Sequence, residues 1–152
     1  MHILPAEQGS EQWKIDRLGI ATGSCFNEII TTKQLKRAKS QYLYLLAAEA
    51  ITGERQDEES DNKHTIRGRE LEPEAIAWYE YEHDVDVVQC GLCLAYEGAM
   101  YGVSPDGLID DVGGLEIKSP ELKTHLKYKA NGVVPDEYLH QVYGCLYVSG
   151  RD

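Results

Sequence analysis

Three charged side chains between residues 104 and 118 have the types and the spacing of a hydrolytic site. Asp106 lies nine intervening residues before the triplet Glu116-Ile117-Lys118. Mg²⁺ prefers oxygen ligands and commonly takes one or two carboxylates, and a bound metal lowers the pKa of its water. A lysine beside it can orient that water, accept its proton or neutralise developing charge. These residues predict a metal-and-water site that cleaves phosphodiester bonds; the alternative is a solvated acidic hairpin that carries a lysine.

The segment between these side chains has the composition of a hairpin turn. It reads Asp110-Asp111-Val112-Gly113-Gly114, and its flanks are predicted to be adjacent antiparallel strands. Alternation along the second strand puts Glu116 and Lys118 on one face and Ile117 on the other, toward a core. The register of the hairpin then decides whether Asp106 joins them.

The length, composition and charge of the chain limit the classes of protein to which it can belong. The 152 residues are 42% hydrophobic and 27% charged, which predicts one domain with a real core. The chain has no apolar run of roughly 18 residues and no signal peptide after Met1, so we expect no membrane partner and a cytoplasmic location. A net charge of −11 argues against a general nucleic-acid coat protein, because phosphate contacts supply most non-specific affinity.

A nuclease stays compatible with this charge, because metal-binding carboxylates raise the acid count and DNA contact can be confined to a basic strip. Candidates for the strip form two runs, and the alternative for each residue is a solvated helix face. The runs are Lys33, Lys36, Arg37 and Lys39, then Lys123, Lys127 and Lys129.

The cysteines do not have the pattern of a disulfide framework in a chain without a secretion signal. They are Cys25, Cys90, Cys93 and Cys145. The Cys90-x-x-Cys93 pair has the spacing of a zinc or redox motif, but it lies in a predicted strand, Val85–Leu94, with no second pair nearby. We expect all of them to be buried thiols.

Local signals predict helices, then short strands, then helices. Ser10 is the expected N-cap of a short helix on which Trp13 packs inward. The other predicted elements are a short helix from about residue 22, a helix over Ala38–Thr52 ended by Gly53, an exposed loop over 54–63, a helix from Gly68 to about Tyr81, three strands between Val85 and Val103, the hairpin, and helices over Leu122–Lys129 and Pro135 to about Val148. This order favours an α/β (α+β) fold with one central sheet.

Helical spacing also predicts which residues share a face. In the helix over 38–52 they are Leu43, Leu46, Ala47, Ala50 and Ile51; in the helix over 68–81, Leu71, Ala75, Trp78 and Tyr79; in the last helix, Tyr138, Gln141, Val142 and Cys145. Pro73 fits the first turn of its helix, which puts Glu72 at the helix start.

Five motifs in order make the chain similar to a known family. They are Gly9-Ser10-Glu11-Gln12-Trp13 leading to Arg17 and Ser24, Arg67-Gly68-x3-Glu72-x2-Ala75, Ser104-Pro105-Asp106-Gly107, Leu115-Glu116-Ile117-Lys118-Ser119-Pro120, and Tyr138-x2-Gln141-Val142. With them the chain resembles the lambda exonuclease and YqaJ-like viral recombinase family of the PD-(D/E)XK nuclease superfamily, from about residue 8 to residue 150. The resemblance lowers the weight of the solvated-hairpin alternative.

The resemblance implies a fold, an activity and partners. The fold is a restriction-endonuclease-like PD-(D/E)XK core, a central mixed β-sheet flanked by helices. The activity is Mg²⁺-dependent 5′-to-3′ digestion of linear double-stranded DNA in phage-type recombination, with Mn²⁺ as a substitute ion, in a bacterial or phage-infected cell. The partners are a single-strand annealing protein and further copies of the chain, in a trimer.

The resemblance also implies residue roles. The metal ligands are Asp106, Glu116, Glu72 and the carbonyl of Ile117, Lys118 is the catalytic lysine, and Gln141 supports the active site. The 5′-phosphate pocket matches Arg17, Ser24 and Ser104, which suits a phosphate dianion; the alternative is a surface ion pair and a helix cap. A further basic residue usual in the family is Lys123 or His125.

One departure from the family leaves alternatives open. Family members continue beyond the region that this chain matches, so we expect a truncated form or a degenerate prophage remnant without the usual C-terminal segment, and with an unpaired sheet edge. The competing function is a catalytically inactive DNA-end-binding relative that binds duplex DNA without cutting it. A third function is an endonuclease of the same fold, which cuts closed circular DNA.

Overall fold

The structure, a computed structural model, describes residues 1–30, 38–57 and 63–151. Its helices are α1 (Glu11–Asp16), the 3₁₀ helix η1 (Gly23–Cys25), α2 (Phe26–Ile30), α3 (Ala38–Thr52), α4 (Lys63–His83), α5 (Leu122–Asn131) and α6 (Asp136–Ser149). Its strands are β1 (His2–Ile3), β2 (Ala21–Thr22), β3 (Val87–Val88), β4 (Cys93–Leu94), β5 (Tyr101–Val103), β6 (Gly107–Ile109) and β7 (Gly113–Leu115). The predicted α/β class is confirmed.

The strands form a mixed sheet and a second, antiparallel sheet. The mixed sheet has the order β1-β4-β5-β2, in which β2 runs parallel to β5 and the other pairs are antiparallel. The second sheet has the order β3-β6-β7. Where the sequence predicts one central sheet, the chain passes from the second sheet to the mixed one between β3 and β4. There the Leu4 amide donates to the Leu92 carbonyl at 2.9 Å, and the N-terminal segment, which contains β1, pairs with the chain leading into β4.

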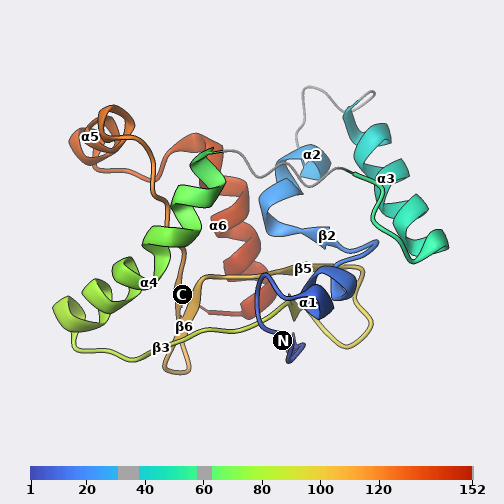
Figure 1. Cartoon of the computed structure of the whole chain (residues 1–152), viewed down its shortest axis with the longest axis horizontal. Helices are drawn as coiled ribbons and strands as arrows, with labels where there is room; N and C mark the ends of the chain where they lie inside the picture. The colour runs from blue at the N-terminus through green and yellow to red at the C-terminus, as the bar shows by residue number, and fades with distance from the viewer. Residues whose placement is uncertain (31–37, 58–62, 152) are drawn as a thin grey trace.

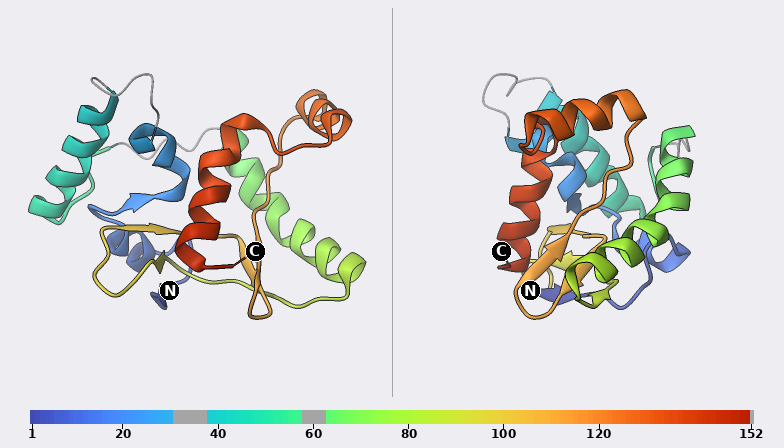
Figure 2. Two further views of the ribbon diagram at one scale, coloured as in Figure 1. Left: turned by 180° about the vertical axis from the view of Figure 1, so that it is seen from behind. Right: turned by 90° about the vertical axis from the view of Figure 1, so that its left-hand side faces the viewer.

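Helix α6 runs through the middle of the molecule, and α3 and α4 lie toward opposite ends of its long axis (Figures 1 and 2). It packs on η1, α2, β4 and β5. Phe26, Val103 and Val148 are buried together in this core. Gly144 permits the contact, because a Cβ on it would lie 2.4 Å from a ring carbon of Phe26. The core thus fixes the helix that carries Gln141.

Helix α3 has the predicted bounds, but its buried face differs from the predicted one. Tyr42 and Glu49 are buried, whereas Ile51 is 83% exposed. The reason is polar: the Gly19 amide donates to the Glu49 carboxylate at 3.1 Å, and the Thr22 amide donates to the Tyr42 hydroxyl at 3.2 Å. Partners outside the helix decide its orientation, and helical spacing does not reveal them.

Helix α4 begins at Lys63, earlier than the predicted start at Gly68, and Pro73 lies inside it and not in its first turn. Pro73 has no amide to donate to the carbonyl four residues earlier, yet the helix continues through it. Its buried residue is Ile76, whereas Trp78, predicted to lie on the apolar side, is 60% exposed. The predicted start of the helix was wrong because Gly68 and Pro73 lower the stability of a helix but do not prevent it from forming.

The other local predictions agree more closely with the structure. The hairpin is confirmed: Gly107 pairs with Leu115, and the turn begins at Asp110, whose φ is 47°. Its second strand ends at Leu115, so the triplet after it lies beyond the strand predicted to contain it. Ser10 caps α1 as predicted, because its side chain accepts a hydrogen bond from the Trp13 amide at 3.2 Å.

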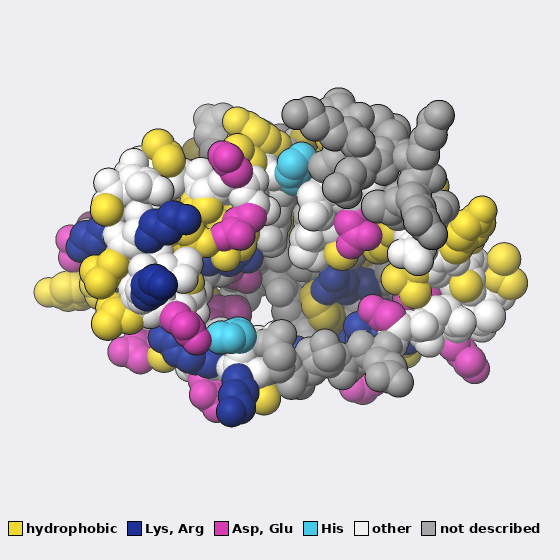
Figure 3. Space-filling view, turned by 90° about the horizontal axis from the view of Figure 1, so that it is seen from above, with side chains coloured by type: hydrophobic (Ala, Val, Ile, Leu, Met, Phe, Trp, Pro, Cys, Tyr) yellow, Lys and Arg dark blue, Asp and Glu magenta, His cyan; other side chains and the backbone are white. Residues whose placement is uncertain are grey.

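No helix among the described residues is long and apolar enough to cross a membrane, and the cytoplasmic location stays a prediction. In the first predicted basic run, Lys33, Lys36 and Arg37 lie outside the described residues, and only the backbone of Lys39 is described. In the second run, all the lysines are exposed on α5. Figure 3 looks down on this end of the molecule and shows Lys and Arg side chains gathered at the left, where α5 lies in Figure 1.

Candidate active site

Glu116 is the centre of the site, just beyond β7. Its Oε1 atom accepts hydrogen bonds from Lys118 Nζ at 2.5 Å and from Gln141 Nε2 at 2.6 Å. The predicted position of Glu116 and Lys118 on one face is confirmed, and α6 adds the carboxamide. Lys118 also lies over the ring of Tyr138, with Nζ 5.4 Å from the ring centroid. The ammonium is therefore positioned on two sides, by a carboxylate and by an aromatic face.

Asp106 is joined to the same segment from the first strand of the hairpin. Its Oδ2 atom accepts a hydrogen bond from the Ile117 amide at 2.5 Å, which continues the pairing of β6 and β7 past their ends. Burial raises the pKa of Asp106, while the Ile117 amide and the Lys118 charge act to lower it. Gln8 Nε2 donates to the carbonyl of the preceding residue, Pro105, at 2.7 Å. The hairpin register thus brings Asp106 to the other charged groups.

Glu72 faces the site from α4, between two contacts that hold this helix. On one side, Arg67 Nη1 donates to the carbonyl of Ser119 at 2.6 Å, directly after the lysine of the triplet. On the other side, the Val87 amide donates to Glu80 Oε1 at 2.8 Å. Burial and the negative charge of Asp106 raise the pKa of Glu72. The two contacts hold Glu72 within electrostatic reach of the hairpin.

The carboxylate of Asp106 lies close enough to those of Glu116 and Glu72 to repel both, and a metal ion would reduce this repulsion. The pKa of Glu116 is raised by burial and then by the charge of Asp106, against the favourable effect of Lys118 and Gln141. Glu116 Oε2 is buried, and no described residue is its hydrogen-bond partner. A divalent cation would relieve both conditions, and an all-oxygen donor set suits Mg²⁺.

The described part of the chain does not supply a complete set of metal ligands by itself. Among the described residues, no three His, Cys, Asp or Glu side chains converge closely enough to hold a metal ion by themselves. Mg²⁺ usually binds through one or two carboxylates and keeps waters and substrate oxygens in its other positions. The arrangement therefore fits an ion that binds together with a phosphate substrate. The Ile117 carbonyl stays a predicted ligand.

Trp13 links two residues of the predicted 5′-phosphate pocket. The Arg17 guanidinium carbon lies 4.1 Å from the centroid of the Trp13 ring, and Trp13 Nε1 donates to Ser104 Oγ at 3.3 Å. Arg17 also donates to Thr22 Oγ1 at 3.3 Å. The Arg17 side chain is partly buried, and this burial lowers its pKa. Such a guanidinium attracts a terminal phosphate more strongly than an exposed one.

Ser24, the third predicted residue of that pocket, is exposed, and no hydrogen bond within the described residues joins it to Arg17 or Ser104. Its role stays a prediction. So does the choice between Lys123 and His125, because both are exposed on α5.

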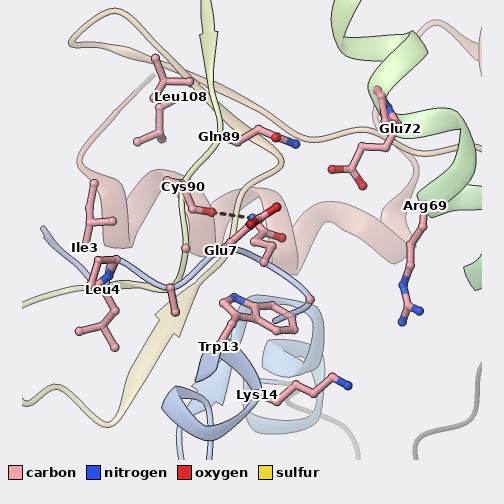
Figure 4. A pocket seen from close by; sticks show the side chains of 17 residues that line it. Ile3, Leu4, Glu7, Trp13, Lys14, Arg69, Glu72, Gln89, Cys90 and Leu108 are labelled. Carbon is pink, nitrogen blue, oxygen red and sulfur yellow. Dashed lines mark hydrogen bonds between the residues drawn. The ribbon is translucent and has the colours of Figure 1, made fainter. Parts of the chain in front are cut away.

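A cleft of about 920 Å³ lies beside these groups, lined by Trp13 and Lys14 of α1, Arg69 and Glu72 of α4, and Cys90. Figure 4 shows the side chains of α4 facing those of α1 across it. A second cavity, of about 370 Å³, shares Trp13 and Lys14 with the cleft and contains Arg17. Of the predicted site residues, Glu72 lines the first cavity and Arg17 lines the second.

Four residues contact the predicted site residues or the segments that carry them, but they were assigned no such role from the sequence. They are Gln8, Trp13, Arg67 and Tyr138. Three of them lie inside the matching motifs, which is the signal that could have found them. Their contacts join segments far apart in the chain, so no local pattern predicts the partner.

Comparison with known proteins agrees with this arrangement. Residues 12–152 match the YqaJ-like viral recombinase domain. No curated protein matches the chain. The chain is similar to two crystal structures of LHK-Exo, one of them described as an alkaline exonuclease from Laribacter hongkongensis and the other solved in complex with dAMP. In each case the identity is 33%, the TM-score is 0.82, and the match covers 93% of this chain and 70% of the other.

The match to the domain extends over most of the chain, and the related structures place the fold among the PD-(D/E)XK nucleases. Two of the motifs that carry the resemblance, residues 115–120 and 138–142, meet at Glu116. The chain therefore belongs to the YqaJ-like viral recombinase family.

Proposed function

We propose that the chain is a Mg²⁺-dependent exonuclease that hydrolyses linear duplex DNA from 5′ ends. One observation carries the proposal: Glu116 is held by Lys118 and Gln141 next to an Asp106 that the Ile117 amide fixes in place. Two carboxylates and an oriented lysine are the groups that metal-assisted phosphodiester hydrolysis requires. Membership of the family and the exonuclease neighbours support the same reaction.

Each side chain has a separate task in this reaction. Asp106, Glu116 and Glu72 would hold the ion, which supplies charge neutralisation and an acidified water when bound. Lys118, on Glu116, orients the attacking water and neutralises charge that develops on the phosphate oxygens. Gln141 keeps Glu116 in one rotamer through its 2.6 Å hydrogen bond. Arg17 positions the terminal phosphate, and so the scissile bond, relative to these groups.

The proposal is tested by following nucleotide release from linear duplex DNA with and without Mg²⁺. We expect release with the ion, none after a chelator is added, and none from closed circular DNA. Cutting of closed circles would show an endonuclease. Binding of duplex ends without release, by protein with an intact circular dichroism spectrum, would show the DNA-end-binding relative.

Replacing Arg17 by alanine is expected to remove the preference for 5′-phosphorylated ends. The wild-type protein should release nucleotides faster from 5′-phosphate than from 5′-hydroxyl DNA, because a charge-assisted hydrogen bond contributes about 1.5–3 kcal/mol, or roughly tenfold to a hundredfold. The 5′-hydroxyl substrate is the internal control, since it lacks the group that Arg17 recognises. An unchanged ratio of the two rates in the variant would exclude Arg17 from the pocket.

The partners are proposed on the family alone. We propose linear duplex DNA as the substrate, an annealing protein as the recipient of the 3′ single strand, and a trimer as the assembly. Sedimentation of the purified chain tests the trimer without any DNA present.

A further inference from the structure

Two thiols lie side by side, outside the groups assigned to hydrolysis, and one of them, that of Cys90, lines the cleft. The Sγ atoms of Cys90 and Cys93 are 3.6 Å apart, and both cysteines are free. The strand predicted through both of them is interrupted: β3 ends at Val88 and β4 begins at Cys93. This interruption brings the two side chains together. A disulfide has an S–S length of about 2.05 Å, so the sulfurs need to approach by roughly 1.5 Å.

The two thiols differ in access and in chemistry. Cys90 is partly exposed and lines the cleft, whereas Cys93 is fully buried within β4. Their hydrogen bond lowers the pKa of the Cys90 thiol, and that bond together with burial raises the pKa of the Cys93 thiol. The accessible sulfur is thus the better nucleophile, and the buried one is placed to attack it afterwards.

We propose that Cys90 and Cys93 are a redox-active dithiol that a hydroperoxide converts to an intramolecular disulfide, and that its closure displaces the residue before Asp106. The Cys90 thiolate attacks a peroxide oxygen, the O–O bond breaks, and hydroxide leaves and takes up the proton that Cys90 had released. Cys93 Sγ then attacks the sulfenic sulfur, and the S–O bond breaks as the hydroxyl leaves with the Cys93 proton as water. Two thiols are oxidised and one hydrogen peroxide is reduced to two waters.

Closure reaches Asp106 through a short path. Gln8 Nε2 donates both to the Cys90 carbonyl at 3.0 Å and to the Pro105 carbonyl at 2.7 Å. Cys93 cannot move far, because it pairs with Ile3 and Val103 in the mixed sheet. Cys90, which lies outside the strands, must make the approach and carry Gln8 with it. A shift at Pro105 changes the placement of the carboxylate that follows it.

A zinc site does not account for the pair. Zinc in proteins usually has four ligands, and within the described residues no third His, Cys, Asp or Glu side chain joins these two sulfurs in a metal-binding group.

The first readout counts free thiols after the folded protein has been treated with hydrogen peroxide. The wild-type chain should lose two of its four thiols, and a dithiol reductant should restore both. Cys90→Ser should retain its remaining thiols, while Cys145→Ser, the matched control, should still lose two. Retention of all four thiols in the wild type, or equal loss in Cys90→Ser, would overturn the dithiol.

The second readout is nucleotide release before and after peroxide, and this arm alone rests on the proposed function. Oxidation should slow the wild type by about tenfold to a hundredfold, because a displacement near 1 Å at a catalytic group has that effect. Cys90→Ser should be insensitive to peroxide. If the thiols are lost and the rate does not change, the coupling to Asp106 is overturned and the disulfide stands. If no reduced form releases nucleotides, the proposed function fails while the thiol count is unaffected.

Discussion

Lys118→Ala is expected to abolish nucleotide release while the fold persists. A positioned acid–base group contributes about 10²–10⁴ to a rate, and the variant should lose at least that factor. The side chain of Lys118 is 34% exposed, and in the variant Gln141 still donates to Glu116 Oε1, so we expect the fold to tolerate the loss of the lysine. The measurement is release from linear duplex DNA at saturating Mg²⁺, with a thermal unfolding curve of the same sample.

Lys63→Ala is the matched control. Lys63 is an exposed lysine at the start of α4, and its replacement removes the same charge from the protein. It should cut DNA at the wild-type rate. Equal rates for the two variants and the wild type would contradict the assignment of Lys118. Loss of release together with a collapsed unfolding transition would instead show that the lysine is structural.

Gly91→Ala is expected to have the largest effect on stability. A Cβ on Gly91 would lie 2.3 Å from the Ala6 carbonyl oxygen and 2.5 Å from the Leu4 carbonyl oxygen. Both obstacles are backbone atoms, and Leu4 is also held by its hydrogen bond to Leu92, so neither can rotate away. Overpacking typically destabilises by about 1–3 kcal/mol, and we expect the upper end or more because the N-terminal segment must separate. The midpoint of urea unfolding measures the change.

Gly114→Ala provides the comparison, because no atom of the described residues lies within 4 Å of a Cβ at Gly114. It should unfold at nearly the wild-type urea concentration, with an unchanged slope. If the two variants unfold at the same concentration, residues 4–6 do not pack on Gly91 in solution.

The features that the sequence predicts well depend on local chemistry. The turn of the hairpin requires residues that tolerate unusual backbone angles, and Asp110 adopts a φ of 47° there. Ser10 caps α1 because the side chain of an N-cap residue accepts a hydrogen bond from the amide two or three positions later, here that of Trp13. The family resemblance implies that Gln141 supports the site, but its hydrogen bond to Glu116, 25 positions away in the chain, has no local signal.

The features that the sequence does not predict depend on distant partners. The two-residue strands β1 and β2 exist only because they pair with β4 and β5, and neither has a pattern of its own. Glu49 is buried because the Gly19 amide needs an acceptor. The approach of Cys90 to Cys93 depends on where the chain leaves one sheet for the other. The sequence predicts one continuous strand through both residues, and such a strand would not bring the two thiols together.

Helix α6 also bears on the order of events during synthesis. It is the last of the described elements in the chain, it fills the core beside Phe26, and it carries the carboxamide that holds Glu116. Chains are made from the N-terminus, and a domain folds once its sequence has left the ribosome. A nascent chain that ends before α6 therefore has its acidic residues without the core and without the group that orients Glu116. The proposed site is therefore complete only after α6 has been made.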